Sequence, residues 1–294
     1  MRVFVTGATG WVGTAVVQDL IASGHQVLGL SRSDKGAEAL KAAGAAVHRG
    51  SLDDLESLTS GATQADGVIH LAFNHDFTKF EANAAEEALA IDAIGDVLEG
   101  SGRPLILTSG VAFLAPGRVA VEADTATPHF PRKPEALAAS LVARGVRTTT
   151  VRLAPTVHGL HDNGFVPRLV QMAREKGVSA YLGDGQNRWP AVHRSDACRV
   201  FRLALERGAE GGPFHAIAEE GIPVKEIAEV IGRRLNIPVV SKSQDEAAEH
   251  FGWFAMFIGL DAPASSARTR EILGWEPTGP TLFQDMADPA YFAV

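Results

Sequence analysis

The sequence predicts an α/β fold in which a doubly wound parallel sheet carries a smaller C-terminal domain. In the first half of the 294 residues, short apolar runs alternate with helical patterns, and this alternation is typical of βαβ units. The apolar runs consist almost entirely of Val, Leu and Ile, as expected where helices cover both faces of a sheet. Thirty glycines favour tight turns between such elements.

The elements of the first half follow one another in order. Apolar runs predict strands at 2–6, 26–31, 45–48, 67–72, 104–108 and 147–153. Apolar residues at helical spacing predict helices at 11–23, 35–43 and 134–144 between these strands. The stretch 79–99 is rich in Ala with acidic residues interspersed, so it predicts a long amphipathic helix.

The second half is less regular. Helices are predicted at 164–176, 195–207, 224–235, 253–260 and 265–273, strands at 212–217 and 238–240, and a turn at 181–185. Ser195 is expected to be the N-cap of its helix. A boundary is expected near Ala154, so that residues 1–154 form the first domain and 191–218 return to it. Residues 155–190 and 219–294 then form the second domain.

Composition excludes several classes of protein. The net charge is −8 and the chain has no basic stripe, so nucleic acid is not an expected partner. Cys198 is the only cysteine, which excludes an intrachain disulfide and a cysteine-based zinc site. No apolar run approaches the roughly 20 residues of a membrane span, and no signal peptide is recognisable. We expect a cytoplasmic protein with a small-molecule substrate and no membrane partner.

The strongest local pattern is Thr6-Gly7-Ala8-Thr9-Gly10-Trp11-Val12-Gly13, between the first strand and the first helix. Gly7 permits a tight turn, Gly10 lets the backbone approach a pyrophosphate, and Gly13 lets the helix pack closely on the strand. The helix N-terminus then offers unpaired N–H groups and a partial positive charge to phosphates. This context predicts a dinucleotide-binding turn rather than a glycine-rich turn without a ligand.

The spacing Thr-Gly-x-x-Gly-x-x-Gly resembles that of the extended short-chain dehydrogenase/reductase family, the NAD-dependent epimerase/dehydratase-like proteins, and the chain is similar to an atypical member. Other segments resemble the family in order, over essentially the whole chain: Val68-Ile69-His70-Leu71-Ala72, Leu107-Thr108-Ser109-Gly110, 151–159, Gly183-Asp184-Gly185 with 188–193, and Leu273-Gly274-Trp275-Glu276-Pro277. The resemblance implies a Rossmann-type sheet with a substrate domain. It also implies cofactor contacts from Gly7, Thr9, Gly10, Trp11, Val12, Gly13, Ser31, Arg32, Ser51, Leu52, Leu71, Ala72, Phe73, Thr108, Leu153 and Ala154.

The end of the second strand predicts the nucleotide. An acidic residue there would bond the ribose 2′-hydroxyl of NAD, whereas a basic residue accommodates the 2′-phosphate of NADP. This strand ends in Ser31-Arg32, and Arg32 offers a planar fork suited to phosphate. Asp34 is a contrary observation, although it lies past the expected position. We therefore expect NADP; a solvated surface role is the alternative for Arg32.

The acid/base pair of the resembled family is missing. The family uses a Tyr with a Lys four residues later, but the only tyrosines, Tyr181 and Tyr291, lie elsewhere in the chain. By spacing, Glu135 stands near the Tyr position and Ala139 near the Lys position.

Two residues are candidate substitutes for this pair. Ser109, at a strand end, and His158, after the sixth strand, are the weak catalytic candidates. Structural roles, as a strand-end hydroxyl and a loop histidine bonded to backbone, are the alternatives for them. His129 is a weaker candidate, and a solvated helix-start carboxylate is the favoured interpretation of Glu135.

Other chemistries have less support. His158, His161 and Asp162 could bind a metal ion, but a loop position explains them more simply, and we expect no metal. No Gly-x-Ser-x-Gly elbow is present, which speaks against a serine hydrolase of that type. Arg188 and His193 could face a substrate or form internal contacts. Trp253, Phe254, Met256 and Phe257 could line an apolar pocket, although a core or lid helix is favoured.

These observations favour an NADP-dependent oxidoreductase acting on a small carbonyl or alcohol compound. A non-catalytic NADP-binding redox sensor and a nucleotide-sugar epimerase-like enzyme are the alternatives, the latter by analogy of fold alone. A homodimer is left open.

Overall fold

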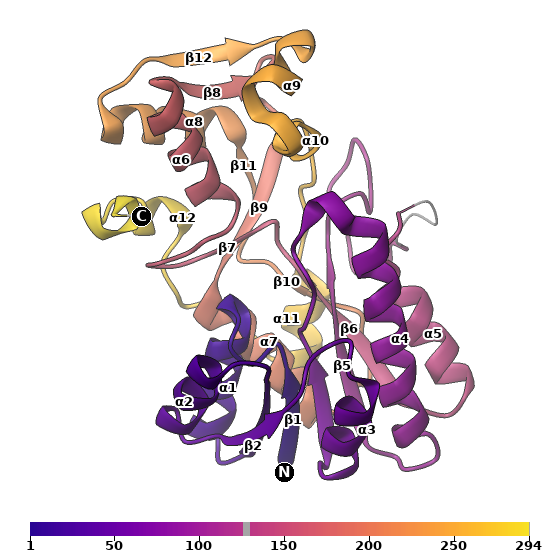
Figure 1. The fold of residues 1–294 in the computed structure, drawn as a ribbon. Helices are drawn as coiled ribbons and strands as arrows, with labels where there is room; N and C mark the ends of the chain where they lie inside the picture. Colours follow the sequence, from indigo (N-terminus) through magenta and orange to yellow (C-terminus); the bar gives the residue numbers. More distant parts are fainter. Residues whose placement is uncertain (126–129, 294) are drawn as a thin grey trace.

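The computed structural model describes residues 1–125 and 130–293. Its main feature is a seven-stranded sheet with the order β10-β6-β5-β4-β1-β2-β3, in which every neighbouring pair is parallel (Figure 1). The strands are β1 (Arg2–Thr6), β2 (Gln26–Ser31), β3 (Ala46–Arg49), β4 (Gly67–His70), β5 (Pro104–Gly110), β6 (Arg147–Leu153) and β10 (Phe214–Ala216). The predicted doubly wound α/β class is confirmed.

Helices cover both faces of this sheet. One face carries α1 (Trp11–Ala22), α2 (Asp34–Ala42) and α7 (Arg194–Glu206), and the other carries α3 (Leu55–Thr63), α4 (Phe80–Leu98) and α5 (Pro134–Ala143). Val16, Leu40 and Phe201 are buried in the core of the first face, whereas Leu58 and Ile91 are buried in that of the second. These two cores explain why β1, β2, β4 and β5 are rich in apolar residues.

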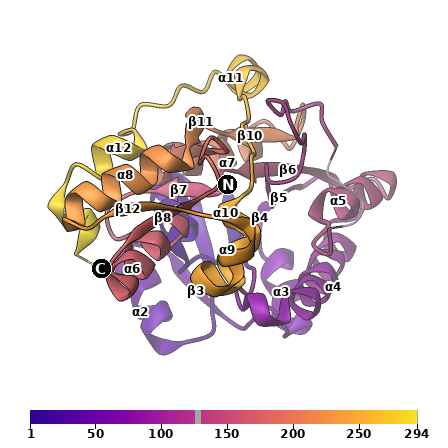
Figure 2. The ribbon, with the colours of Figure 1, turned by 90° about the horizontal axis from the view of Figure 1, so that it is seen from above.

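A second unit lies above the carboxyl ends of the main strands (Figures 1 and 2). It contains the sheet β11-β9-β7 and the parallel pair β12-β8. Its strands are β7 (Thr156–His158), β8 (Ser179–Leu182), β9 (Arg188–His193), β11 (Glu219–Pro223) and β12 (Val239–Lys242). Its helices are α6 (Phe165–Lys176), α8 (Val224–Leu235), α9 (Gln244–Phe251), α10 (Ala255–Ile258) and α12 (Leu282–Asp285), with 3-10 turns η2 (Gly252–Phe254) and η3 (Pro289–Phe292).

Two further elements belong to the main-sheet unit. The turn η1 (Phe77–Lys79) leads into α4, and α11 (Ala267–Leu273) contacts β10 and α7 of the main sheet. Ala264 and Trp275, which flank α11, are buried in the core of the first face. Part of the C-terminal sequence therefore packs on the first domain, although the sequence pattern assigns all of 219–294 to the second.

Three sequence expectations are corrected. His193, not Ser195, is the N-cap of α7, and its ring accepts a hydrogen bond from the backbone N–H of Ser195, because the helix begins one residue earlier than predicted. Tyr181 and Leu182 belong to β8 rather than to a turn, because that segment pairs with β12. The fourth strand ends at His70 rather than at residue 72 as predicted. No helix of the described ranges is long and apolar enough to cross a membrane.

Candidate functional site

A cleft of 1710 Å³ lies at the carboxyl ends of the parallel strands, beneath the second unit. Ligands of open α/β sheets bind at this edge. All of the residues that the sequence predicts to contact a dinucleotide line the cleft, except Ser31. The Ser31 side chain is buried and its hydroxyl donates instead to the carbonyl oxygen of Ser33 at 3.0 Å.

The glycine turn lines one end of this cleft, and each of its three positions requires glycine for a different reason. Gly7 has a φ of +65°, and a Cβ on it would lie 2.8 Å from the backbone nitrogen of Ala72. A Cβ on Gly13 would lie 2.0 Å from the carbonyl oxygen of Gly7. A Cβ on Gly10 would meet only that same oxygen, at 3.2 Å, and would otherwise extend into the cleft.

The N-terminus of α1 is open toward this space. Gly10 is the N-cap and offers no side chain to the first N–H groups, and α1 begins at Trp11. The Trp11 ring is fixed by a hydrogen bond from its Nε1 to the carbonyl oxygen of Val157, at 2.7 Å. Unpaired helix N–H groups beside a glycine that leaves room for a phosphate fit a dinucleotide.

Arg32 lines the same cleft and its side chain is exposed. Asp53 lies near it, and the Ser51 hydroxyl and the positive charge of Arg32 both lower the pKa of this carboxyl group. Asp34, the contrary observation, is not in the cleft and forms an ion pair with Arg49. Asp53 also lines the cleft, although none of the sequence motifs predicts it.

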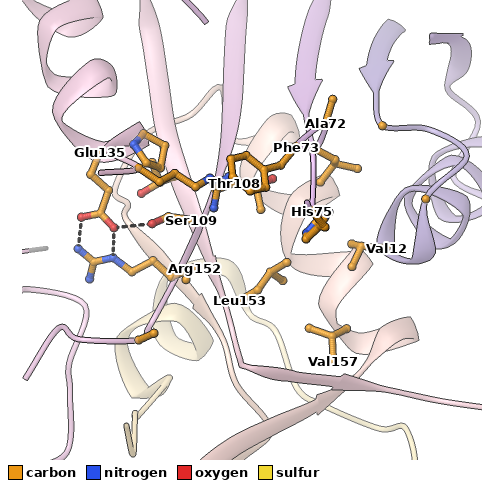
Figure 3. A pocket seen from close by; sticks show the side chains of 18 of the residues that line it. Val12, Ala72, Phe73, His75, Thr108, Ser109, Glu135, Arg152, Leu153 and Val157 are labelled. Carbon is orange, nitrogen blue, oxygen red and sulfur yellow. Dashed lines mark hydrogen bonds and ion pairs between the residues drawn. The ribbon is translucent and has the colours of Figure 1, made fainter. Parts of the chain in front are cut away.

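A buried polar cluster lies deeper, where β5 and β6 end (Figure 3). The Ser109 hydroxyl donates to Glu135 Oε1 at 2.9 Å. The Arg152 guanidinium donates to both oxygens of the same carboxylate, at 2.7 Å to Oε1 and 2.6 Å to Oε2. Such a two-point contact fixes the carboxylate in position. Glu135, expected to be solvated, is instead held between a strand-end hydroxyl and an arginine.

Arg152 is the organising residue of this cluster, a role that the sequence motifs do not predict. Its side chain is 1% exposed, and it also donates to the carbonyl oxygens of Glu122 and Asp124, at 3.2 and 2.7 Å. The His215 ring lies 3.1 Å from it, and burial lowers the pKa of that histidine. A charged residue in an otherwise buried strand was the signal that could have identified it.

A second arginine connects the end of β5 with the Phe73 ring. Arg132 donates to both carboxylate oxygens of Glu87, at 2.7 and 2.5 Å, and to the carbonyl oxygen of Thr108, at 2.9 Å. Its guanidinium carbon also lies 4.6 Å from the centre of the Phe73 ring. Arg132 therefore holds an aromatic side chain beside the strand end that carries Ser109.

His70 lies beneath this strand end, where burial favours its neutral form. Its Nδ1 lies 2.9 Å from the Thr6 hydroxyl, and its carbonyl oxygen accepts from the Thr108 hydroxyl at 2.8 Å. Burial, with a smaller contribution from the charge of Arg132, lowers the pKa of His70 to about 3.

His158 is not placed with Ser109. Its ring is fully buried and does not line the cleft, and its Nδ1 lies 2.6 Å from Asp285 Oδ2. Its position after β6 predicts the correct edge of the sheet, but the side chain packs into the second unit.

The other candidate residues also lie away from Ser109. Arg188, paired with Asp261 at 3.0 Å, does not line the cleft, and nor does His193. His129 lies outside the described residues.

Of the aromatic and Met group, Trp253 and Phe257 line the cleft, and Phe254 and Phe257 are buried in the second core. Among residues 1–125 and 130–293, no group of three or more His, Cys, Asp or Glu side chains could hold a metal ion.

Neither tyrosine lines the cleft. Tyr291 is buried and its hydroxyl lies 3.3 Å from Asp162 Oδ2, while Tyr181 is in β8. Burial and the charge of Asp162 raise the pKa of Tyr291, which disfavours a tyrosinate. Tyr181→Phe and Tyr291→Phe should therefore each keep most of any turnover measured as NADPH consumption. A loss of about 10²-fold or more in one of them alone, with an unchanged melting temperature, would show that a distant tyrosine supplies the proton.

Comparisons with known proteins give a consistent result. A model of the NAD dependent epimerase/dehydratase family matches residues 3–98. An uncharacterised protein of Schizosaccharomyces pombe is 50% identical over 295 residues, which cover 99% of this chain and 100% of that protein. The 4-hydroxy-2-methyl-3-oxo-4-farnesyl-3,4-dihydroquinoline-1-oxide ketoreductase of Stigmatella aurantiaca is 28% identical, and the match covers 90% of this chain and 84% of that protein.

Among solved structures, the UDP-glucose 4-epimerase of Thermus thermophilus, in complex with NAD, has a similar fold, with a TM-score of 0.77. The match covers 100% of this chain and 99% of that one, at 19% identity.

Proposed function

From its membership of the NAD-dependent epimerase/dehydratase family, we propose that this chain is an NADP-dependent oxidoreductase that interconverts a carbonyl compound and its alcohol. The chain belongs to this family, the extended short-chain dehydrogenases/reductases, whose members are NAD(P)-dependent oxidoreductases and epimerases. The observation that carries the proposal is the position of Ser109. Its hydroxyl lines the same cleft as the open N-terminus of α1, at the strand end next to β4 and β6.

The nucleotide, when bound, supplies or accepts the hydride. When a substrate is bound, the Ser109 hydroxyl turns its single hydrogen from Glu135 to the carbonyl oxygen of the substrate and passes it that proton as the oxygen gains negative charge. In the free protein this hydrogen is donated to Glu135, which holds the hydroxyl at the strand end. In the reverse direction the Glu135 carboxylate accepts the proton that Ser109 takes from an alcohol. Arg152 positions the carboxylate for both directions.

This pairing of a serine with a carboxylate takes the place of the Tyr and Lys that the family uses. Glu135 stands close to the position of the Tyr, on the first turn of α5, and it faces Ser109 across the end of β5. Support for carbonyl reduction also comes from the Stigmatella relative, which is named as a ketoreductase. A screen of NADPH oxidation over carbonyl compounds, with nucleotide affinity measured in parallel, tests the proposal.

Preference for NADP is the first expected result. We expect the protein to bind NADP more tightly than NAD, and Arg32→Ala to weaken NADP binding by about ten- to a hundredfold without weakening NAD binding. A charge-assisted contact with a phosphate contributes roughly 1.5–3 kcal/mol, and NAD has no 2′-phosphate for Arg32 to contact. Titration calorimetry with both nucleotides provides the measurement.

Lys35→Ala is the matched control, because it removes a nearby cation that does not line the cleft. Equal affinity of the unmodified protein for the two nucleotides would contradict the assignment, as would an equal loss of affinity in both variants.

A further inference from the structure

The upper half of the cleft is lined by aromatic side chains. Seven of the chain's 14 phenylalanines line the cleft, together with Trp253. They come from segments far apart in the sequence: the connection after β4, the start of α4, the connection between β5 and α5, the start of α6, and η2 with α10. We call the six residues Phe73, Phe77, Phe80, Phe130, Trp253 and Phe257 the aromatic wall.

The rings of this wall are ordered against one another. Phe77 and Trp253 stack with centroids 4.9 Å apart and planes 13° from parallel, so the stack joins the main-sheet unit to the second unit. Phe77 also stacks with Phe80 at 6.0 Å, and Phe80 lies 5.2 Å from Phe130. Offset stacking and edge contacts of this kind are favourable and give the wall a defined shape.

The wall lies between the second hydrophobic core and the cleft, because Phe257 is buried in that core and Phe77 packs against it. Trp253 is 45% exposed, and the Phe77, Phe80 and Phe130 side chains are partly exposed, whereas the neighbouring Phe254 is completely buried. A contiguous apolar surface inside a cleft is costly to leave in contact with water, and such surfaces mark binding sites.

Backbone strain beside the aromatic wall also indicates a ligand site. Phe113, whose ring centroid lies 5.3 Å from that of Phe130, has a φ of +64°. This left-handed conformation is rare for a bulky residue and persists where the surroundings impose it, as they do at ligand sites. Phe113 itself lines the cleft.

Two arginines that line the cleft form ion pairs with carboxylates of the protein itself. Arg132 is paired with Glu87, and Arg152 with Glu135. Apart from Arg32 at the glycine turn, the other cations that line the cleft are Lys133, Arg168 and Arg268, which stand on three separate segments. The wall therefore favours a flat uncharged group over a phosphorylated one.

We propose that the substrate of this cleft is an aryl aldehyde or aryl ketone without a phosphate group, with its ring against the aromatic wall and its carbonyl group at Ser109. The identification of the reacting end rests on the function proposed above. In the reduction, a hydride from NADPH adds to the carbonyl carbon and a proton from Ser109 to the oxygen, giving the alcohol and NADP⁺. Glu135 takes up one proton from the solvent and returns it to Ser109, so that the net reaction consumes one proton.

Binding in the presence of NADP⁺ tests the substrate class separately from turnover, because an aldehyde cannot be reduced by the oxidised nucleotide. Titration calorimetry of the NADP⁺-saturated protein should show that benzaldehyde binds about three- to tenfold more tightly than cyclohexanecarbaldehyde, which has a saturated ring of the same carbon number. UDP-glucose should bind more weakly than either. Equal affinity for the two aldehydes, or tighter binding of UDP-glucose, would overturn the proposal.

Variants assign the preference to the wall. Trp253→Leu and Phe77→Leu keep an apolar side chain but remove a ring, and each should reduce the preference for benzaldehyde to about twofold or less. Met256→Leu is the matched control, because Met256 is on α10 beside Trp253, is 58% exposed and does not line the cleft. A preference that survives in both ring variants would refute the placement.

NADPH oxidation with the same two aldehydes separates this proposal from the general one. Turnover of both without preference would leave the oxidoreductase standing and refute the aryl substrate. Selective binding of benzaldehyde without any turnover would support the aryl site and contradict the oxidoreductase.

Discussion

Replacing Gly10 by valine is expected to abolish binding of NADP and NAD while leaving a folded protein. A Cβ at this position meets only the Gly7 carbonyl oxygen, at 3.2 Å, so the core is not disturbed. The branched methyl groups would instead fill the space before the N-terminus of α1, where a pyrophosphate must approach the backbone N–H groups. Titration calorimetry measures the loss of binding, and circular dichroism measures the retained fold.

A control at the neighbouring glycine makes the result specific. Gly13→Ala places a methyl group 2.0 Å from the Gly7 carbonyl oxygen, so the turn and helix must separate and the melting temperature should fall. Gly10→Val should lose nucleotide affinity with little change in melting temperature, and Gly13→Ala should lower both. A Gly10→Val protein with a native spectrum and native affinity would remove the basis for the phosphate site.

The sequence predicts the main sheet well because the signals for it are local. Strands β1, β2, β4 and β5 are rich in apolar residues, and α1, α2, α4 and α5 repeat their apolar residues within a few turns. The short helix α3, whose sequence is mostly polar or small, was not predicted. β7, β9 and β11 were not predicted. β7 has three residues, β9 contains Pro190, and β11 shows a register shift, so none has a clear period of two. They become strands through pairing between segments that are distant in the sequence.

The candidate site divides in the same way. The glycine turn was found because its requirements are those of a single strand-turn-helix unit. The ion pair between Glu135 and Arg152 could not be predicted from the sequence, because it depends on β6 lying beside the start of α5. His158 follows the correct strand, yet its direction is set by Asp285, 127 residues later in the chain.

Replacing Ser109 by alanine is expected to lower kcat for carbonyl reduction by about 10²- to 10⁴-fold with unchanged affinity for NADP. Alanine removes the hydroxyl that polarises the substrate oxygen and transfers the proton, and it adds no volume. Ser109→Thr keeps a hydroxyl at the same position and should retain much more of the activity. Steady-state kinetics of NADPH oxidation, with nucleotide titration of each variant, provides the comparison.

Glu135→Gln distinguishes an orienting carboxylate from a structural one. Gln can still accept a hydrogen bond from Ser109, but it cannot take up the proton that Ser109 passes on during alcohol oxidation. We therefore expect this variant to lose kcat and to change the pH profile of alcohol oxidation, with KM affected little. Because Glu135 also holds Arg152, a fall in melting temperature without these kinetic changes would assign the carboxylate to folding alone. Full activity in Ser109→Ala would exclude Ser109 as the proton donor.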